Sequence, residues 1–211
     1  MSDLAATAAT NTSGKTRTMV ETALLIAVTI IMGMTPLGTI RTPFLSVSLV
    51  TVPVALAAML IGPMGAFACG TIFGITSFIN ALTGASGLLS TLFNINPFGV
   101  FVTAIIARML DGILDGLIFK GLHKAMKRNP VSYYITGLAA PVLNTVFFMG
   151  SLVLFFYHTD YIQDMASGLG ATNPMAFIVA LVGIQGVIEA VVGCALAGTV
   201  GLLVAKALKR R

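Results

Sequence analysis

A small set of polar residues stands inside long apolar stretches of the sequence. They are Arg108, Asp111 and Asp115 in one stretch, Asn144 and Thr145 in a second, and Gln185 and Glu189 in a third. Spacings of three, four and seven residues bring side chains to one face of a helix. Because polar and ionisable groups are costly in hydrocarbon, each of them indicates a functional site.

The depths of these residues place them close together. With a rise of about 1.5 Å per residue, Arg108 lies roughly 15 Å, Asn144 roughly 20 Å and Glu189 roughly 22 Å below the outer ends of their helices. The sequence therefore predicts a polar cluster near the membrane midplane that binds a small solute. Alternatively, Arg108 only neutralises Asp111 or Glu189 and holds helices together. Asp115 lies nearer the cytoplasmic end and is not expected to join the cluster.

Motifs for enzymatic chemistry are missing from the sequence. The two histidines, His123 and His158, have no partners at the spacing of a hydrolase or metalloprotease motif, and no GxxxxGK[ST] segment is present. Cys69 and Cys194 lie in apolar stretches without metal-ligand spacing, so a role in packing is expected. We expect neither an enzyme nor a metal site, and the chain cannot hydrolyse ATP by itself.

The composition defines the class of protein. Hydrophobic residues make up 57% of the 211 residues and charged residues only 9%, whereas soluble domains carry about 25% charged residues. Mean hydropathy is +0.99. Between Arg41 and Arg108 there is no charged residue, and a spanning helix needs about 20 mostly apolar residues. The sequence therefore predicts an all-α integral membrane protein.

Six transmembrane helices account for the chain. They are expected over residues 18–37, 46–61, 64–82, 98–124, 131–157 and 174–206, with breaks at Pro36, at Gly62-Pro63 and at Gly84. A polar loop, residues 85–97, carries Asn94 and Asn96. Residues 1–17 are expected to form a disordered cytoplasmic tail, and residues 18–211 a single six-helix membrane domain.

Basic residues predict the orientation. Ten of the 12 lysines and arginines fall on one side of a six-span arrangement, leaving Arg41 opposite and Arg108 inside a helix. Cytoplasmic loops carry this excess, so both termini are expected in the cytoplasm. The asymmetry also explains the net charge of +5, which therefore does not indicate nucleic-acid binding. The lipid bilayer is the expected surrounding.

Small residues recur at helical spacing. Gly70 and Gly74 form a GxxxG, and Ala23 and Ala27 form an AxxxA. Such residues let helices approach closely, either within the chain or, where they face lipid, against another membrane protein.

The segment SLVTVPVALAAMLIGPMGAFACGTIFGITSFINAL (residues 48–82) resembles the substrate-specific S components of energy-coupling-factor (ECF) vitamin transporters. Its GP turn and its GA-x3-G-x3-G-x2-S helix are typical of that family. Six helices, cytoplasmic termini and the AxxxA motif fit as well, and the resemblance covers most of the chain from Thr18. Within the family, PVLNTVFFMGSLVLFF (residues 141–156) and NPFGVFVTAIIAR (residues 96–108) are most similar to pantothenate-type S components.

The resemblance implies a small subunit in the plasma membrane of a prokaryote that binds one vitamin in an outward-facing pocket. It would dock through Ala23 and Ala27 on a transmembrane coupling subunit, which works with two ATPase subunits. Those subunits, not this chain, would bind ATP and Mg²⁺.

For pantothenate, Arg108 would offset the carboxylate, and Asn144, Gln185 and Asn96 would hydrogen-bond the neutral groups. Glu189 would serve a hydroxyl or orient Arg108. Asn94 completes the set of expected substrate-binding residues. Because Glu189 and Asp111 are unfavourable near an anion unless paired, a pyridoxine-like or pyrimidine ligand stays open. A self-sufficient secondary carrier, with Arg108, Asp111 and Glu189 as an ion relay, is the alternative from another class.

Overall fold

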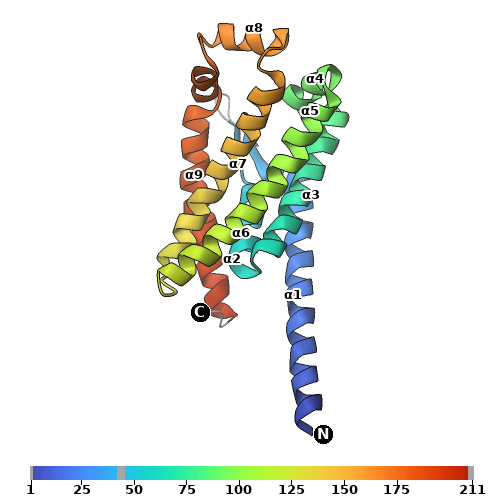
Figure 1. Ribbon diagram of the computed structural model, residues 1–211, viewed down its shortest axis with the longest axis vertical. Coiled ribbons are helices and arrows are strands. Elements are labelled where there is room, and N and C mark those ends of the chain that lie inside the picture. The colour runs from blue at the N-terminus through green and yellow to red at the C-terminus, as the bar shows by residue number, and fades with distance from the viewer. Residues whose placement is uncertain (1, 42–45, 209–211) are drawn as a thin grey trace.

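The computed structural model describes the backbone of residues 2–41 and 46–208 and the side chains of residues 15–38 and 48–208. In this part of the chain, five helices are long and apolar enough to cross a membrane. They are Lys15–Met34 of α1 (Ser2–Met34), α3 (Pro63–Leu82), the composite helix Pro97–Ala125, α7 (Val131–Phe156) and α9 (Pro174–Ala207). They run side by side along the long axis (Figure 1). The expected helical membrane fold is confirmed, whereas the count of six spans stays a prediction.

The second predicted span differs from the expectation. Instead of a helix over residues 46–61, the structure has α2 (Thr51–Leu60), which at 1.5 Å per residue is only about 15 Å long. Before it, β1 (Thr39–Arg41) and β2 (Ser46–Ser48) form an antiparallel hairpin in which Ile40 pairs with Val47. The helix prediction over residues 46–50 was therefore wrong. β-Branched residues such as these favour strands once a partner strand is available.

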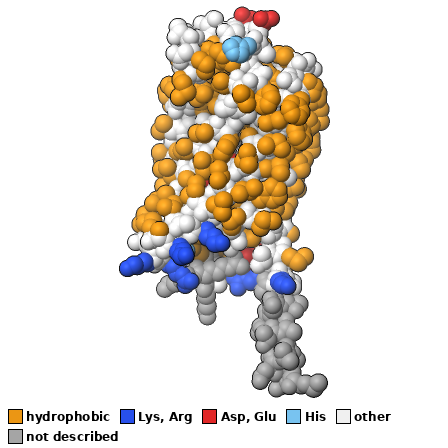
Figure 2. All heavy atoms as spheres, viewed as in Figure 1, with side chains coloured by type: hydrophobic (Ala, Val, Ile, Leu, Met, Phe, Trp, Pro, Cys, Tyr) orange, Lys and Arg blue, Asp and Glu red, His pale blue; other side chains and the backbone are white. Residues whose placement is uncertain are grey.

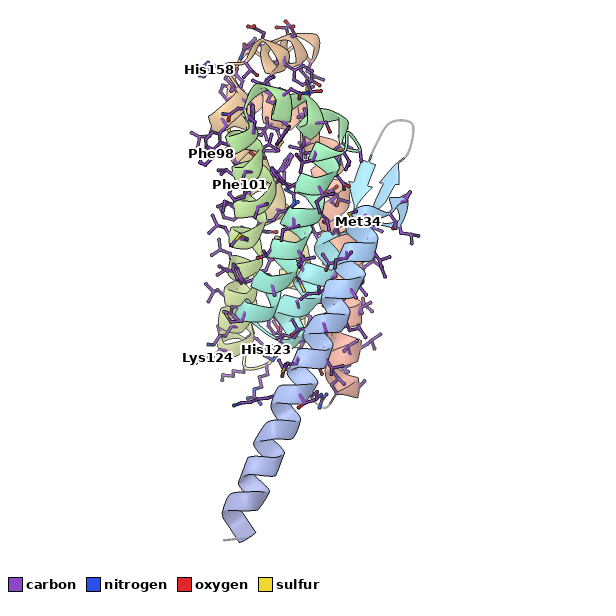
Figure 3. All side chains as sticks on the ribbon, turned by 90° about the vertical axis from the view of Figure 1, so that its right-hand side faces the viewer. Met34, Phe98, Phe101, His123, Lys124 and His158 are labelled. Atoms are coloured by element: carbon purple, nitrogen blue, oxygen red, sulfur yellow. The ribbon has the colours of Figure 1, made fainter. Side chains whose placement is uncertain are left out.

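The first helix also ends earlier than expected. α1 stops at Met34 (Figure 3), and η1 (Pro36–Gly38) is a single 3₁₀ turn, because a residue before proline is pushed out of the helical region. At its other end the helical backbone begins at Ser2, in the segment where we expected a disordered tail, and the division at residue 17 stays a prediction. Both ends of the described chain lie at the same end of the bundle (Figure 1).

The other predicted helices are confirmed to within one residue at each end. The fourth is made of α5 (Pro97–Phe101), the π-helical turn η2 (Val102–Ile106) and α6 (Ala107–Ala125). The predicted loop over residues 85–97 contains a short helix, α4 (Gly87–Ile95), and α8 (Asp160–Gly168) joins α7 to α9. α4 and α8 lie at the end of the bundle opposite the chain ends (Figure 1).

Glycines allow α3 to pack directly against the helix of η2 and α6. A Cβ added to Gly70 would meet the carbonyl oxygen of Arg108, and one added to Gly74 would lie 2.8 Å from that of Ala104. From the other side, a Cβ on Gly112 would meet the carbonyl oxygen of Ala66. The GxxxG of α3 therefore serves packing within the chain, where small residues allow close approach of backbones.

The outer surface matches a membrane environment. On the face shown in Figure 2, apolar side chains cover most of the length of the bundle, lysines and arginines gather at the end that holds the chain ends, and acidic side chains stand out at the opposite end. Lys209, Arg210 and Arg211 lie outside the described residues. The asymmetry of charge seen in the sequence is thus an asymmetry between the two ends of the fold.

Candidate functional site

A cavity of about 290 Å³, here called the central cavity, lies between α3, α6, α7 and α9. Its lining residues are Ser48, Phe73, Leu88, Arg108, Asn144, Thr145, Phe148, Met149, Leu181, Val182, Gln185 and Glu189. Small-molecule sites typically enclose about 300–1,000 Å³ and combine apolar walls with a few polar groups. The central cavity has this character and suits a small solute.

Arg108 contacts two aromatic rings. Its guanidinium carbon lies 4.4 Å from the ring centre of Phe73 on α3 and 5.0 Å from that of Phe148 on α7. A cation over the face of an aromatic ring is attracted by the ring's π electrons. The guanidinium also carries N–H donors in a planar fork whose geometry matches a carboxylate. The two rings therefore stabilise a buried positive charge in the wall of the central cavity.

The π-helical turn supports Arg108 from within its own helix. The Nη1 atom donates to the carbonyl oxygens of Thr103 and Ala104, both at 3.2 Å. These carbonyls belong to η2, where the regular i→i+4 pattern is interrupted, and such turns occur frequently at functional sites. The Nε atom is buried and has no hydrogen-bond partner among the described residues. The side chain is therefore oriented while part of its donor capacity stays unused.

Glu189 connects the cavity to the hairpin. Its Oε1 accepts a hydrogen bond from the backbone N–H of Ser48, at 2.7 Å, and another from Nε2 of Gln185, at 3.2 Å. Glu189 lies 15 residues into α9, so β2 reaches about 22 Å below the outer end of that helix. Non-helical backbone at membrane depth is tolerated where it is buried or lines a cavity, and Ser48 does line it.

Asn144 supplies a third polar group, on α7. Its Oδ1 atom is buried and has no partner in the described part of the chain. A close crossing with α9 positions it, because a Cβ on Gly193 would lie 2.6 Å from Cγ of Pro141 and 2.7 Å from the carbonyl oxygen of Gly137. Unpaired buried polar groups cost about 1–3 kcal/mol each. A ligand that bonds to Asn144 would recover that free energy.

The central cavity thus offers polar groups of two kinds. Arg108 presents N–H donors and a positive charge, whereas Glu189 and Gln185 present oxygen acceptors, with Asn144 able to donate or accept. Such a set of groups can bind a solute that carries both an anionic group and hydroxyl or other donor groups.

The alternative that Arg108 only neutralises a carboxylate stays a prediction, because Arg108 and Asp111 attract each other electrostatically but without a direct contact. Within residues 15–38 and 48–208, the one ion pair joins Arg17 and Glu21, 2.9 Å apart on α1. Asp111 and Asp115 are almost completely buried, yet neither lines the central cavity. Arg108 therefore makes no direct ion pair in the described structure, although it shares a helix with both aspartates.

Four of the six predicted binding residues come together, and two do not. Arg108, Asn144, Gln185 and Glu189 line one cavity, as the depth argument predicts. Asn96 instead caps α5, because its Oδ1 accepts the N–H of Gly99 at 3.0 Å. Asn94 is exposed, donates to the carbonyl oxygen of Ser90 at 3.3 Å and is not among the lining residues.

The sequence reasoning also missed residues of the site. Phe73 and Phe148 look like ordinary packing residues, and only their contact with Arg108 distinguishes them. Ser48 was assigned to a helix, whereas it contributes its backbone N–H from a strand. The Asn96-Pro97 dipeptide, by contrast, is a readable signal for a helix start, since Pro is favoured at the first helical position.

Ala23 and Ala27 lie away from the central cavity. Both are exposed, whereas Leu25 and Thr29 on the same helix are buried against α2 and α3. The AxxxA motif therefore faces outward from the bundle. α1 leaves an apolar outer face there, with Leu24 61% exposed.

Fold and cavity together define a multi-pass helical membrane protein with a pocket for a small polar solute. The comparison with known families is consistent with this class: the model described as "ECF transporter, substrate-specific component" matches residues 17–200. The chain belongs to this family. Its members are non-catalytic, substrate-binding subunits of the cell membrane that work with a transmembrane coupling subunit and ATPase subunits. No curated protein matches the chain closely enough to count as a relative.

Proposed function

We propose that this S component binds a small vitamin that carries a carboxylate together with hydroxyl or amide groups, and that the vitamin is pantothenate. The observation that carries the proposal is the buried guanidinium of Arg108, which lines the central cavity beside the rings of Phe73 and Phe148. A charge-assisted, two-pronged contact with a carboxylate is the interaction that such a fork makes best.

The rest of the central cavity suits the remainder of that molecule. Pantothenate has an amide in its middle and two hydroxyls at its far end. Asn144 would bond to the amide, and Gln185 and Glu189 would accept from the hydroxyls. Glu189 already accepts two hydrogen bonds on Oε1, which leaves Oε2 for a ligand. The apolar walls, among them Leu181 and Val182, would contact the methyl groups.

Glu189 also supports the rival ligand class. A carboxylate in a low-dielectric cavity favours a cationic or neutral donor-rich partner, such as a pyridoxine-like or pyrimidine vitamin precursor. In that case Arg108 would balance Glu189 across the cavity and would not contact an anion. The two classes are separated by whether binding requires a carboxylate on the ligand.

A direct binding experiment tests the proposal. Purified protein in detergent is screened by thermal unfolding with pantothenate, its alcohol analogue, pyridoxine and a pyrimidine precursor, and then titrated with labelled pantothenate. A ligand present at 100 times its Kd stabilises the folded state by about 2.7 kcal/mol. We expect stabilisation by pantothenate and saturable binding below micromolar. Stabilisation by pyridoxine or the pyrimidine alone would assign the cavity to the other class.

We further propose that six segments cross the membrane, with the hairpin and α2 forming the second, and that both termini are cytoplasmic. The gathering of lysines and arginines at one end supports this orientation (Figure 2). In a background without Cys69 and Cys194, a Lys124→Cys side chain should react with an impermeant maleimide only in opened cells. An Asp164→Cys side chain should react in intact cells, and the reverse pattern would refute the orientation.

The outward-facing Ala23 and Ala27 are proposed as the surface that docks on the coupling subunit. Small side chains on an exposed helix face permit close contact with a partner helix. ATP and Mg²⁺ would then be bound by the partner ATPase subunits, which would supply the energy for uptake.

A further inference from the structure

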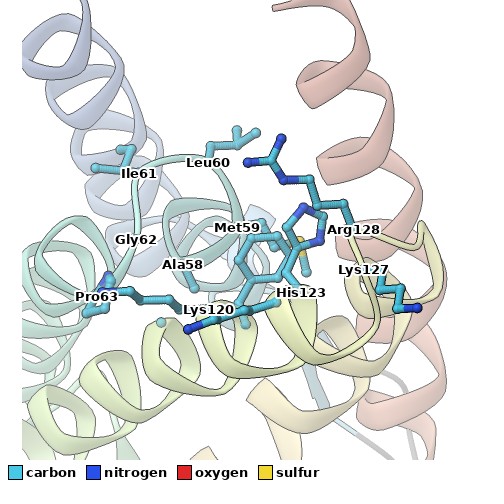
Figure 4. A pocket seen from close by; sticks show the side chains of 13 residues that line it. Ala58, Met59, Leu60, Ile61, Gly62, Pro63, Lys120, His123, Lys127 and Arg128 are labelled. Carbon is cyan, nitrogen blue, oxygen red and sulfur yellow. The ribbon is translucent and has the colours of Figure 1, made fainter. Parts of the chain in front are cut away.

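A second pocket lies at the basic end of the bundle, far from the polar groups of the central cavity. Its volume is about 740 Å³, and it lies between the α2–α3 turn and the last turns of α6 (Figure 4). Its apolar part includes Met59, Pro63 and Phe119, and its basic part includes Lys120, Lys124 and Lys127. We call it the basic pocket.

Charge in the basic pocket is strongly one-sided. Four lysine and arginine side chains line it, and no aspartate or glutamate is among the described lining residues. The three lysines make no ion pair within the described part of the chain. Like charges brought together in one pocket repel one another, so an anion bound among them would lower the electrostatic free energy.

The turn after α6 helps to build the basic wall. Lys127 and Arg128 have φ values of 50° and 63°, a left-handed conformation that side chains with a Cβ adopt rarely. The N–H of Arg128 donates to the carbonyl oxygen of His123 at 2.8 Å, and that of Lys127 to Lys124 at 3.2 Å, which closes the helix in a Schellman-type cap. Both residues line the pocket (Figure 4).

The depth of the pocket corresponds to the headgroup region of a bilayer. The helix Pro97–Ala125 has 29 residues and is therefore about 43 Å long, longer than the hydrocarbon core of about 30 Å. Its basic end then lies among headgroups. Next to the pocket along the chain, Met64 is 77% and Leu117 49% exposed, so apolar surface for an acyl chain adjoins the basic groups.

We propose that the basic pocket binds an anionic phospholipid of the surrounding leaflet, with the phosphate among Lys120, Lys124 and Lys127. The acyl chains would extend over the apolar surface beside Met64 and Leu117. Basic pockets at the ends of transmembrane helices recognise such headgroups, and the combination of cations with an apolar floor fits a lipid better than a water-soluble anion. The proposal does not depend on which vitamin the central cavity binds.

Native mass spectrometry of the purified protein, without vitamin, tests the proposal that the basic pocket binds an anionic phospholipid. The protein is titrated with phosphatidylglycerol or phosphatidylcholine, and a Lys120→Gln/Lys124→Gln double variant is compared with Lys15→Gln/Lys206→Gln. Both variants lose two charges at the same end of the bundle, but Lys15 and Lys206 do not line the basic pocket. Each lysine near a membrane surface strengthens anionic-lipid binding about fivefold.

We expect phosphatidylglycerol to bind about thirty-fold more weakly to the first variant, equivalent to about 2 kcal/mol, and nearly unchanged to the second. Thermal stabilisation by phosphatidylglycerol, measured alongside, should not be reproduced by inorganic phosphate. Equal losses in both variants would show diffuse attraction and overturn the proposal, as would equal affinity for the two lipids. Unchanged lipid binding together with lost association with the coupling subunit would assign the pocket to a protein partner instead.

Retained vitamin binding in the first variant would show that the protein is folded. If no vitamin binds even to the unaltered protein, the proposed function fails while the lipid result still stands, so the two failures are distinguishable.

Discussion

Replacing Arg108 with methionine separates the charge of this side chain from its bulk. Methionine is unbranched and adaptable, so it can fill the space between Phe73 and Phe148, while the guanidinium donors and the positive charge disappear. In the structure the guanidinium carbon lies 4.4 and 5.0 Å from the two ring centres, in a buried setting with Arg108 only 7% exposed. A carboxylate bound there would be desolvated together with its partner.

The size of the effect follows from that burial. Removing one partner of a buried ion pair costs about 3–5 kcal/mol, which corresponds to about 150-fold to 4,000-fold in Kd. A ligand in which a CH₂OH group replaces the carboxylate has no charge to lose, so its affinity should fall less than about tenfold. Arg108→Lys keeps the charge without the fork and should weaken the carboxylate ligand by an intermediate factor.

Isothermal titration of purified variants with pantothenate and its alcohol analogue measures this difference. Thermal unfolding of each variant without ligand serves as the control for folding. The prediction concerns the ratio of the two losses, which a general loosening of the cavity would not change. If both ligands lose affinity by the same factor in Arg108→Met, Arg108 does not bind a carboxylate and the reasoning is refuted.

Three other sets of substitutions give equally defined expectations. The double substitution Ala23→Leu/Ala27→Leu should abolish co-purification with the coupling subunit. The Kd for the vitamin should stay unchanged, since both residues face outward from the bundle. Retained co-purification would contradict the docking assignment. Gly70→Ala should lower the free energy of unfolding by about 1–3 kcal/mol, because its Cβ would meet the carbonyl oxygen of Arg108. The control Gly121→Ala should leave the free energy of unfolding unchanged, since a Cβ there has nothing within 4 Å. Equal unfolding temperatures of the two variants would argue against the close packing of α3 on α6. Glu189→Ala should weaken vitamin binding by about 1–3 kcal/mol in titrations. Glu189→Gln should weaken it less, because the amide oxygen still accepts the hydrogen bond from Ser48. If Glu189→Gln lost more affinity than Glu189→Ala, Glu189 would not act as a hydrogen-bond acceptor in vitamin binding.

The sequence was most informative where composition and depth decide the structure. Charge-free runs predicted the long helices, since few other arrangements can bury so much apolar surface. The same logic predicted that four polar residues meet in one cavity: Arg108, Asn144, Gln185 and Glu189. Polar side chains at the same depth on packed helices are expected to face the interior together. Their common location is confirmed, whereas their roles in binding stay predictions that the experiments above test.

Features that depend on tertiary contacts were not predictable in this way. Residues 46–48 directly precede an apolar run that forms a helix, and only pairing with β1 and the contact between Ser48 and Glu189 make the strand favourable. Asn96 was assigned to the ligand although its local partner, the N–H of Gly99, already occupies it. Asp111 shares a helix with Arg108 and is buried, but it does not line the central cavity, a difference that a face of i, i+3 positions does not resolve.

The π-helical turn η2 also sets the rotational phase of the helix that follows it. Each residue of an α-helix advances by about 100° around the axis, and a π turn accommodates one residue more than an α turn. Before η2 the helix presents Gly99 to Phe156 of α7, and after it Gly112 to α3. Deleting one residue from Val102–Ile106 would restore a uniform helix and rotate Arg108 by about 100° relative to the outer half. The extra residue therefore rotates the inner half of the helix relative to the outer half. With this rotation, one helix packs against both α7 and α3 while Arg108 still lines the central cavity.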